Sequence, residues 1–255
     1  MNDIEYILDF TVNLGGRMLA TGANLERVND TMNRICLSYH LNSISIFSLS
    51  STIILSAKTA DNIPGTRQIA VPPASNHLEK LNRLNQLSRR VCAETPAPET
   101  LDELLKEAEN IKEYSTVTVI IGQLIAMTSL GVIFGGTPAD IAAVDLISFV
   151  LFWMIRWLNK PNLTHIIVNT ICMWIAGTLA IFCVKLGLGD HPFIIIITSS
   201  MMLIPGIPLV NAFRNILCGN EMNGILEFLK VILETLAIVL GVILSIYFFG
   251  GLISW

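Results

Sequence analysis

Apolar residues follow two different spacings in the first 115 residues. Leu25, Val28, Met32 and Ile35 recur at intervals of three and four, and this spacing predicts an amphipathic helix. Residues 43–58 instead alternate β-branched residues with serines, which predicts two strands around residues 48–52, and residues 66–71 add a candidate third strand. Helical spacing returns afterwards, first behind a capping box that begins at Asn76 and then in a last helix predicted to run to residue 114.

After residue 115 the apolar residues form long, nearly uninterrupted runs. A helix needs about 20 apolar residues to cross the hydrocarbon core of a bilayer. Five runs approach that length, and they predict membrane spans near residues 116–134, 140–158, 164–186, 192–213 and 225–249.

Charge divides the chain at the same place. Residues 1–115 hold 25 charged side chains and residues 116–255 hold 11. We therefore predict two domains, an α+β cytoplasmic N-terminal domain (1–115) and an all-α polytopic membrane domain (116–255) of about five transmembrane helices. The first 20 residues lack a basic leader before an apolar run, so we expect no signal peptide. Arg156 and Arg214 close the second and fourth spans, which places those ends in the cytoplasm.

Composition argues against several classes of function. The net charge of −4 favours no nucleic-acid partner. The five cysteines and four histidines are dispersed, so we expect no metal and no disulfide framework. No phosphate-binding loop or nucleophile motif occurs, so we expect no cofactor and no enzymatic activity. His165, near the start of the third span, is the one internal histidine near a position that a membrane-embedded enzyme could use.

The predicted fourth span contains a break. Pro205, Gly206 and Pro208 interrupt its helix, and each proline removes a backbone N–H and displaces the carbonyl one turn earlier. In hydrocarbon the freed carbonyls need a partner, and interrupted spans hold the solute in many secondary transporters. A simple proline kink is the alternative.

Polar residues near this break and inside the spans are candidate functional groups. The half-helix after the break aligns Pro208, Asn211 and Asn215 on one face, next to Arg214, and its positive end favours a carboxylate. Ser199, before the break, offers a hydroxyl, although serine in such helices commonly bonds its own backbone. Asp145 and Glu234 lie inside spans and are candidates for proton coupling, with a helix-to-helix hydrogen bond as the alternative. For Asp140 we expect a structural role at an interface.

Three segments resemble the threonine/serine exporter (ThrE-like) family. They are residues 203–212 (LIPGIPLVNA) with Gly219 and Asn223-Gly224, residues 14–28 (LGGRMLATGANLERV), and Phe134-Gly135-Gly136 before Asp140. The chain is similar to the half-length YjjP-type members, which are implied to work with a small YjjB-type membrane subunit in succinate export. Members often place an aspartate shortly after the Pro-Gly motif, where this chain has Asn215.

The resulting hypothesis is a subunit of a secondary exporter in the bacterial cytoplasmic (inner) membrane. It would move a small carboxylate metabolite outward, either threonine/serine or a succinate-like dicarboxylate, and be proton-coupled. One broken span supplies only half of a repeat-built transporter, so we expect a YjjB-like subunit or self-assembly to complete the pathway. The alternative is a non-transporting regulatory or assembly subunit.

Overall fold

A computed structural model describes residues 3–49, 51–72, 77–111, 114–158 and 163–252. The chain forms two compact units. The first unit joins Met1–Lys112 with Ile207–Phe228, and the second unit joins Glu113–Gly206 with Leu229–Trp255. Residues 207–228, which the sequence analysis assigned to the membrane domain, therefore pack with the N-terminal residues.

The first unit contains a three-stranded antiparallel sheet of order β1-β2-β3. Its strands are β1 (Asn42–Leu49), β2 (Thr52–Lys58) and β3 (Pro64–Ala70). Ile53 on the central strand pairs with Ser48 on one side and Ile69 on the other. The strands predicted on both sides of residues 48–52 and the third strand are confirmed. They could be predicted because a half-buried strand alternates apolar and polar residues along the local sequence.

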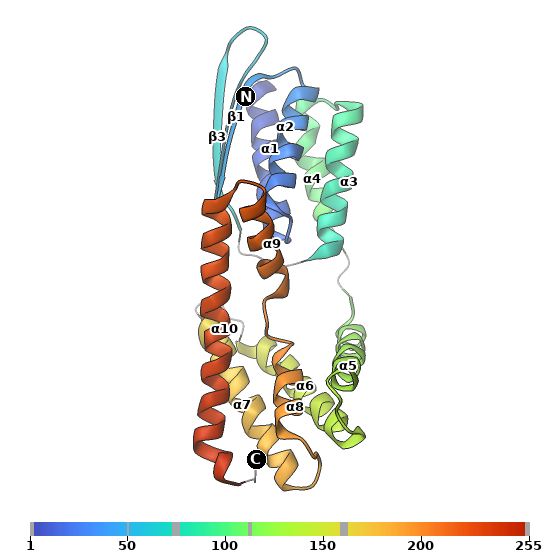
Figure 1. The fold of residues 1–255 in the computed structure, drawn as a ribbon. Helices are drawn as coiled ribbons and strands as arrows, with labels where there is room; N and C mark the ends of the chain where they lie inside the picture. The colour runs from blue at the N-terminus through green and yellow to red at the C-terminus, as the bar shows by residue number, and fades with distance from the viewer. Residues whose placement is uncertain (1–2, 50, 73–76, 112–113, 159–162, 253–255) are drawn as a thin grey trace. The chain divides into compact units, whose positions relative to one another are not determined.

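Four helices complete the N-terminal part of this unit. They are α1 (Asp3–Ala20), α2 (Leu25–Ser38), α3 (Leu78–Glu94) and α4 (Leu101–Glu109). α1 contacts the sheet and also α3 and α4, so α1 and α2 form the middle of three layers (Figure 1).

Two helix ends in this part differ from the predicted boundaries or lie beside residues that are not described. The helix predicted to reach residue 114 ends at Glu109, so that prediction is wrong at its C-terminal end. The predicted cap Asn76 lies outside the described residues, and His77 caps α3 by accepting the Lys80 N–H at Nδ1 (3.1 Å).

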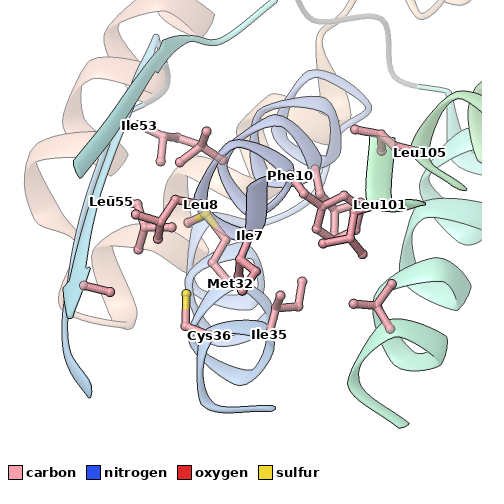
Figure 2. Packing of buried hydrophobic residues seen from close by; sticks show 14 of the residues in the cluster. Ile7, Leu8, Phe10, Met32, Ile35, Cys36, Ile53, Leu55, Leu101 and Leu105 are labelled. Atoms are coloured by element: carbon pink, nitrogen blue, oxygen red, sulfur yellow. The ribbon is translucent and has the colours of Figure 1, made fainter. Parts of the chain in front are cut away.

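The core of the first unit lies on both sides of α1. Figure 2 shows Leu8 facing Ile53 of β2, while Phe10 points toward Leu101 and Leu105 of α4. All of these side chains are buried. Removing this apolar surface from water is the main favourable term that holds the three layers together.

The second unit is built from long apolar helices. It contains α5 (Thr116–Ile133), α6 (Pro138–Leu158), α7 (His165–Lys185) and the short α8 (Pro192–Ser200). The last helix, α10 (Glu221–Phe249), contributes its residues from 229 onward.

Four helices among the described residues are long and apolar enough to cross a membrane. They span Thr116–Ile133, Pro138–Leu158, His165–Lys185 and Glu221–Leu252. The predicted fourth span is not among them, because it is divided between α8 and α9 (Gly206–Leu217). The count of five spans is therefore not confirmed. Large apolar side chains such as Ile125, Trp157 and Leu236 are exposed on this unit, as expected where lipid rather than water surrounds the helices.

Glycines let α10 approach α7 closely within the second unit. A Cβ on Gly241 would lie 2.6 Å from the Thr170 carbonyl oxygen and 2.8 Å from Met173 Cβ. Thr170 Oγ1 also donates to the Ala237 carbonyl oxygen (3.2 Å). Small residues at such crossings are the usual means of helix packing in membranes, where apolar burial alone supplies little drive.

Gly241→Val should therefore separate α7 from α10. We expect the variant to lose about 1–3 kcal/mol of stability through overpacking and to melt at a lower temperature in detergent. Gly122→Val is the matched control, because a Cβ at Gly122 on α5 meets no atom within 4 Å. Both changes have a similar intrinsic effect on helix propensity, so equal melting temperatures would contradict the close packing.

Candidate functional site: a polar cluster in the membrane unit

The interruption of the fourth apolar run lies at residues 201–205. α8 ends at Ser200, and the N–H groups of Met201 and Leu203 make short i to i−3 bonds to Thr198 and Ser200 (3.1 and 2.9 Å). The Ile204 carbonyl, whose helical partner would be Pro208, accepts the Gly206 N–H instead (2.8 Å).

The two prolines of the motif have different effects. Pro205 marks the break, and α9 begins at the next residue, Gly206. Pro208 lies inside the first turn of α9, where a missing N–H costs little because the first N–H groups of a helix have no intrahelical partner. Only the first proline therefore separates the two half-helices.

Polar side chains of α5 and α6 contact one another inside the otherwise apolar second unit, and α8 carries a further buried hydroxyl, that of Ser199. Gln123 on α5 donates through Nε2 to the Ser148 carbonyl oxygen of α6 (2.8 Å), and the same atom lies 3.2 Å from Met202 Sδ, just after α8. Thr128 Oγ1 of α5 donates to Asp145 Oδ2 of α6 (2.8 Å). We call this group the inner polar cluster and define it as Gln123, Thr128, Asp145, Ser148 and Ser199.

Three oxygens of this cluster are buried and have no hydrogen-bond partner among the described residues. They are Asp145 Oδ1, Ser148 Oγ and Ser199 Oγ. Ser148 and Ser199 are fully buried, among apolar side chains such as Ile147 and Ile196. An unsatisfied buried polar group costs about 1–3 kcal/mol, so three of them in one helical unit are atypical of a purely structural core. Hydroxyl and carboxylate groups of this kind can form hydrogen bonds with a solute, and the carboxylate can take up a proton.

The predicted site residues do not all lie in this cluster. Asp145 and Ser199 belong to it, while Pro205 and Gly206 follow Met202 closely in the chain. Glu234 lies on α10, 91% buried, with its Oε1 4.0 Å from Lys230 Nζ. In the described part of the chain no hydrogen bond joins Glu234 to the cluster.

Asn211 and Arg214 belong to the first unit. Asn211 Nδ2 donates to the Gly22 carbonyl oxygen in the α1–α2 turn (3.3 Å), and Arg214 is exposed on α9. Together with Pro208 they stay predicted solute contacts that no observation tests. Asn211 already has a structural partner.

A buried hydrogen-bond chain fastens α9 to the N-terminal residues. Asn24 Nδ2 donates to Asn215 Oδ1 (2.9 Å), and Asn215 Nδ2 donates to Glu227 Oε2 of α10 (3.0 Å). Asn24 also caps α2 by accepting the Glu26 N–H at Oδ1 (3.0 Å). The sequence predicted Asn215 on one face of the half-helix with Pro208 and Asn211, and as a departure from a family pattern. Its buried contacts are what place it in the core of the first unit.

A second asparagine joins the same region to the sheet. Asn223 Nδ2 at the start of α10 donates to the Ser48 carbonyl oxygen of β1 (3.0 Å). Gly224 permits this arrangement, because a Cβ there would lie 2.7 Å from the Ala212 carbonyl oxygen of α9. Residues 14–28 and residues 207–224, from two of the segments that carry the family resemblance, thus lie in one compact unit. The only sequence signal for such a contact is that both segments are rich in glycine and asparagine.

Asp140 has the structural role expected for it. Its side chain is 1% exposed, and Oδ1 accepts the backbone N–H groups of Asp190 (2.7 Å) and His191 (2.8 Å) in the α7–α8 connection. Oδ2 accepts the Thr137 N–H (3.0 Å) and lies 2.8 Å from His191 Nδ1. This carboxylate therefore fastens the connection that leads into α8.

The described part of the chain contains neither a cluster of metal ligands nor a disulfide bond. No three His, Cys, Asp or Glu side chains gather there as a metal site would need. The five cysteines are free thiols, of which Cys36, Cys172 and Cys183 are buried.

Comparison with known proteins places the chain in a family. The family model described as "Putative threonine/serine exporter" matches residues 9–249, so the chain belongs to the threonine/serine exporter family. A Mycobacterium tuberculosis (strain ATCC 25618 / H37Rv) protein described as "Probable threonine/serine exporter" is 25% identical over 245 residues. That match covers 94% of this chain and 46% of the relative, so the chain spans about half the length of its relative. No solved structure matches.

The family model and the relative are both described as threonine/serine exporters. With several apolar helices, they also indicate a multi-pass membrane protein. The resemblance of residues 14–28 and 203–224 to this family is thereby confirmed.

Proposed function

We propose that this chain is a subunit of a secondary exporter. It moves a small carboxylate metabolite, threonine/serine or a succinate-like dicarboxylate, outward across the bacterial cytoplasmic membrane, with movement coupled to protons. The N-terminal residues lie in the cytoplasm. Family membership supports the export of a small solute, and the printed description of the relative favours threonine and serine as the first solutes to test.

The inner polar cluster is the observation that carries this proposal. Its unpartnered oxygens Asp145 Oδ1, Ser148 Oγ and Ser199 Oγ lie inside an apolar helical unit beside a broken helix. Hydroxyl and carboxylate oxygens can bond an ammonium group or a solute hydroxyl, which threonine and serine possess. An acidic side chain in a membrane helix is the usual carrier of a coupled proton.

We assign solute contact to the break and proton handling to the acidic side chains. Ser199, Pro205 and Gly206 form the near wall of the solute site, and Asp145 carries the proton. Glu234 is a second proton-coupling residue, and Pro208, Asn211 and Arg214 form further solute contacts.

A second set of spans completes the pathway in this proposal. The chain matches only 46% of its relative, and the exposed apolar faces of α5 and α10 leave room for further helices. A small YjjB-like membrane subunit, or a second copy of this chain, supplies them.

Ser199→Ala should reduce solute efflux about tenfold, the equivalent of one lost hydrogen bond to the solute. The measurement is efflux of labelled threonine, serine and succinate from preloaded proteoliposomes containing the chain with a co-expressed YjjB-type subunit. Ser200→Ala is the matched control, because Ser200 Oγ already donates to the Ile197 carbonyl oxygen (2.7 Å).

Asp145→Asn tests the coupling in the same vesicles. Its efflux should no longer respond to an imposed pH gradient, while wild-type efflux should respond and lose the response with a protonophore. Wild-type rates in both Ser199→Ala and Asp145→Asn would remove the inner polar cluster from transport. They would leave the chain as a regulatory or assembly subunit.

A further inference from the structure

A groove in the first unit lies between α2 and α3, which pack side by side (Figure 1). Its volume is about 480 Å³, and an adjoining hollow of about 340 Å³ shares Arg27, Asn85 and Arg89 with it. On each helix, four lining residues occupy positions i, i+3, i+4 and i+7. Residues at this spacing share one face of a helix, so one face of each helix lines the groove. These positions are Arg27, Asp30, Thr31 and Arg34 on α2, and Asn85, Ser88, Arg89 and Cys92 on α3.

Two guanidinium groups in the groove have no ion-pair partner among the described residues. Arg34 is neutralised by Asp30, with Nη2 2.9 Å from Oδ2. Arg27 and Arg89 have no such acid. The contrast on α3 is direct, since the arginines outside the groove, Arg83 and Arg90, each pair with a glutamate on the same helix.

The neutral polar side chains of the groove already donate hydrogen bonds to backbone carbonyls, so the arginines are the candidate groups for binding an anion. The Thr31 and Ser88 hydroxyls donate to the backbone of their own helices (2.8 Å each), as does the Asn85 amide. Among the described residues of the groove, the cations without an ion-pair partner are therefore the two guanidiniums of Arg27 and Arg89, whose planar N–H groups match the oxygens of carboxylate or phosphate.

Charge and shape together favour a phosphate group. A single carboxylate carries one charge and occupies one guanidinium fork. A phosphate monoester carries −1.5 to −2 at neutral pH and offers three acceptor oxygens, enough to neutralise both arginines. The groove is also open to solvent and large enough for the remainder of a small metabolite or for the headgroup of a lipid.

We propose that the groove between α2 and α3 binds a phosphate monoester through Arg27 and Arg89. This site is separate from the inner polar cluster and stands whether or not the chain exports threonine. The phosphate belongs either to a free metabolite or to the headgroup of an anionic lipid, and the experiment distinguishes these sources.

Cys92 supplies a reporter at this site. It lines the groove, so a ligand that fills the groove should block a maleimide from reaching its thiol. Burial raises the pKa of this thiol, so alkylation is faster at higher pH. The exposed Cys218 is first replaced by serine, and alkylation of Cys92 in the full chain is then timed at pH 8.

Saturating glycerol 3-phosphate should slow alkylation in phosphatidylcholine nanodiscs about fivefold, and acetate should not, because phosphate engages both guanidiniums. Arg27→Gln/Arg89→Gln should raise the half-protecting concentration at least about tenfold. Arg83→Gln/Arg90→Gln removes the same number of charges outside the groove and should leave it within about twofold.

Nanodiscs of phosphatidylcholine with added phosphatidic acid test the lipid source. Protection by phosphatidic acid alone, lost in Arg27→Gln/Arg89→Gln, assigns the phosphate to a lipid headgroup, and protection by glycerol 3-phosphate assigns it to a free metabolite. The proposal is overturned if neither protects Cys92, or if protection is equal in the two double variants.

Discussion

Asp140→Ala is expected to release the connection between α7 and α8 and to lower the melting temperature of the protein more than any other single change considered. Its carboxylate accepts two backbone N–H groups from residues 190 and 191 and a third from Thr137. Alanine would remove the buried carboxylate that accepts from these N–H groups, and breaking a buried charged network typically costs about 3–5 kcal/mol.

The loss of stability should depend on which side chain replaces Asp140. Asp140→Asn keeps an oxygen for the Asp190 and His191 N–H groups but turns the second oxygen into a donor that faces the Thr137 N–H, so its stability should be intermediate. Asp190→Asn is the control, because exposed Asp190 accepts from the Thr137 hydroxyl (2.7 Å) and an amide oxygen can do the same. Thermal unfolding in detergent measures all three. Equal melting of Asp140→Ala and Asp190→Asn would refute the anchoring role.

Asn215→Asp is expected to destabilise the first unit, although it is nearly isosteric. The amide nitrogen of Asn215 lies 3.0 Å from Glu227 Oε2, and the side chain is 1% exposed. The substitution replaces this donor with a second carboxylate oxygen, which places two like charges in contact at low dielectric. We expect a loss of about 2–3 kcal/mol, the cost of a lost hydrogen bond to a charged group plus repulsion.

A second substitution should repair the first. Glu227→Gln provides an amide that can donate to the new carboxylate, so Asn215→Asp/Glu227→Gln should recover most of the wild-type stability. Double-mutant analysis of chemical or thermal unfolding gives the coupling between the two positions. Asn82→Asp, on the exposed face of α3, adds the same charge without this contact and should be nearly neutral. An additive double variant would mean that the two side chains do not interact.

This experiment also bears on the departure from the family pattern. Where other members place an aspartate shortly after the Pro-Gly motif, Glu227 makes that residue unfavourable in this chain unless its partner changes as well. The identity of residue 215 is therefore tied to residue 227.

Much of the architecture could be predicted from local patterns. The spacing of Leu25, Val28, Met32 and Ile35 identified α2, and alternation after Ser43 identified the strands, because burial on one face imposes a period that the local sequence retains. Asp145 was a candidate because ionisable groups are costly in apolar helices, and Ser199 because its hydroxyl precedes the break. The structure buries an oxygen of each, and their roles in transport stay predictions.

Other features of the site depend on residues far apart in the sequence. Hydropathy extended the fourth run through residue 213, because α9 is apolar enough to resemble part of a span, yet it packs with the first unit through Asn211 and Asn215. Hydropathy reports how apolar a segment is and not which surface covers it. The same limit applies to Gln123 and Ser148, whose pairing depends on how α5 packs on α6.

The sequence by itself determined the division between a charged N-terminal part and apolar helices, the helical and strand periods, the break at Pro205 and the exporter family. These properties are carried by composition and by neighbours a few residues apart. Only the tertiary structure decided that α9 joins the first unit, that Asn24 bonds Asn215 across 191 positions of sequence, and that Arg27 and Arg89 line one groove. Such contacts arise from the packing of whole elements, and no local pattern encodes which distant side chain will satisfy a buried amide or leave a guanidinium unpaired.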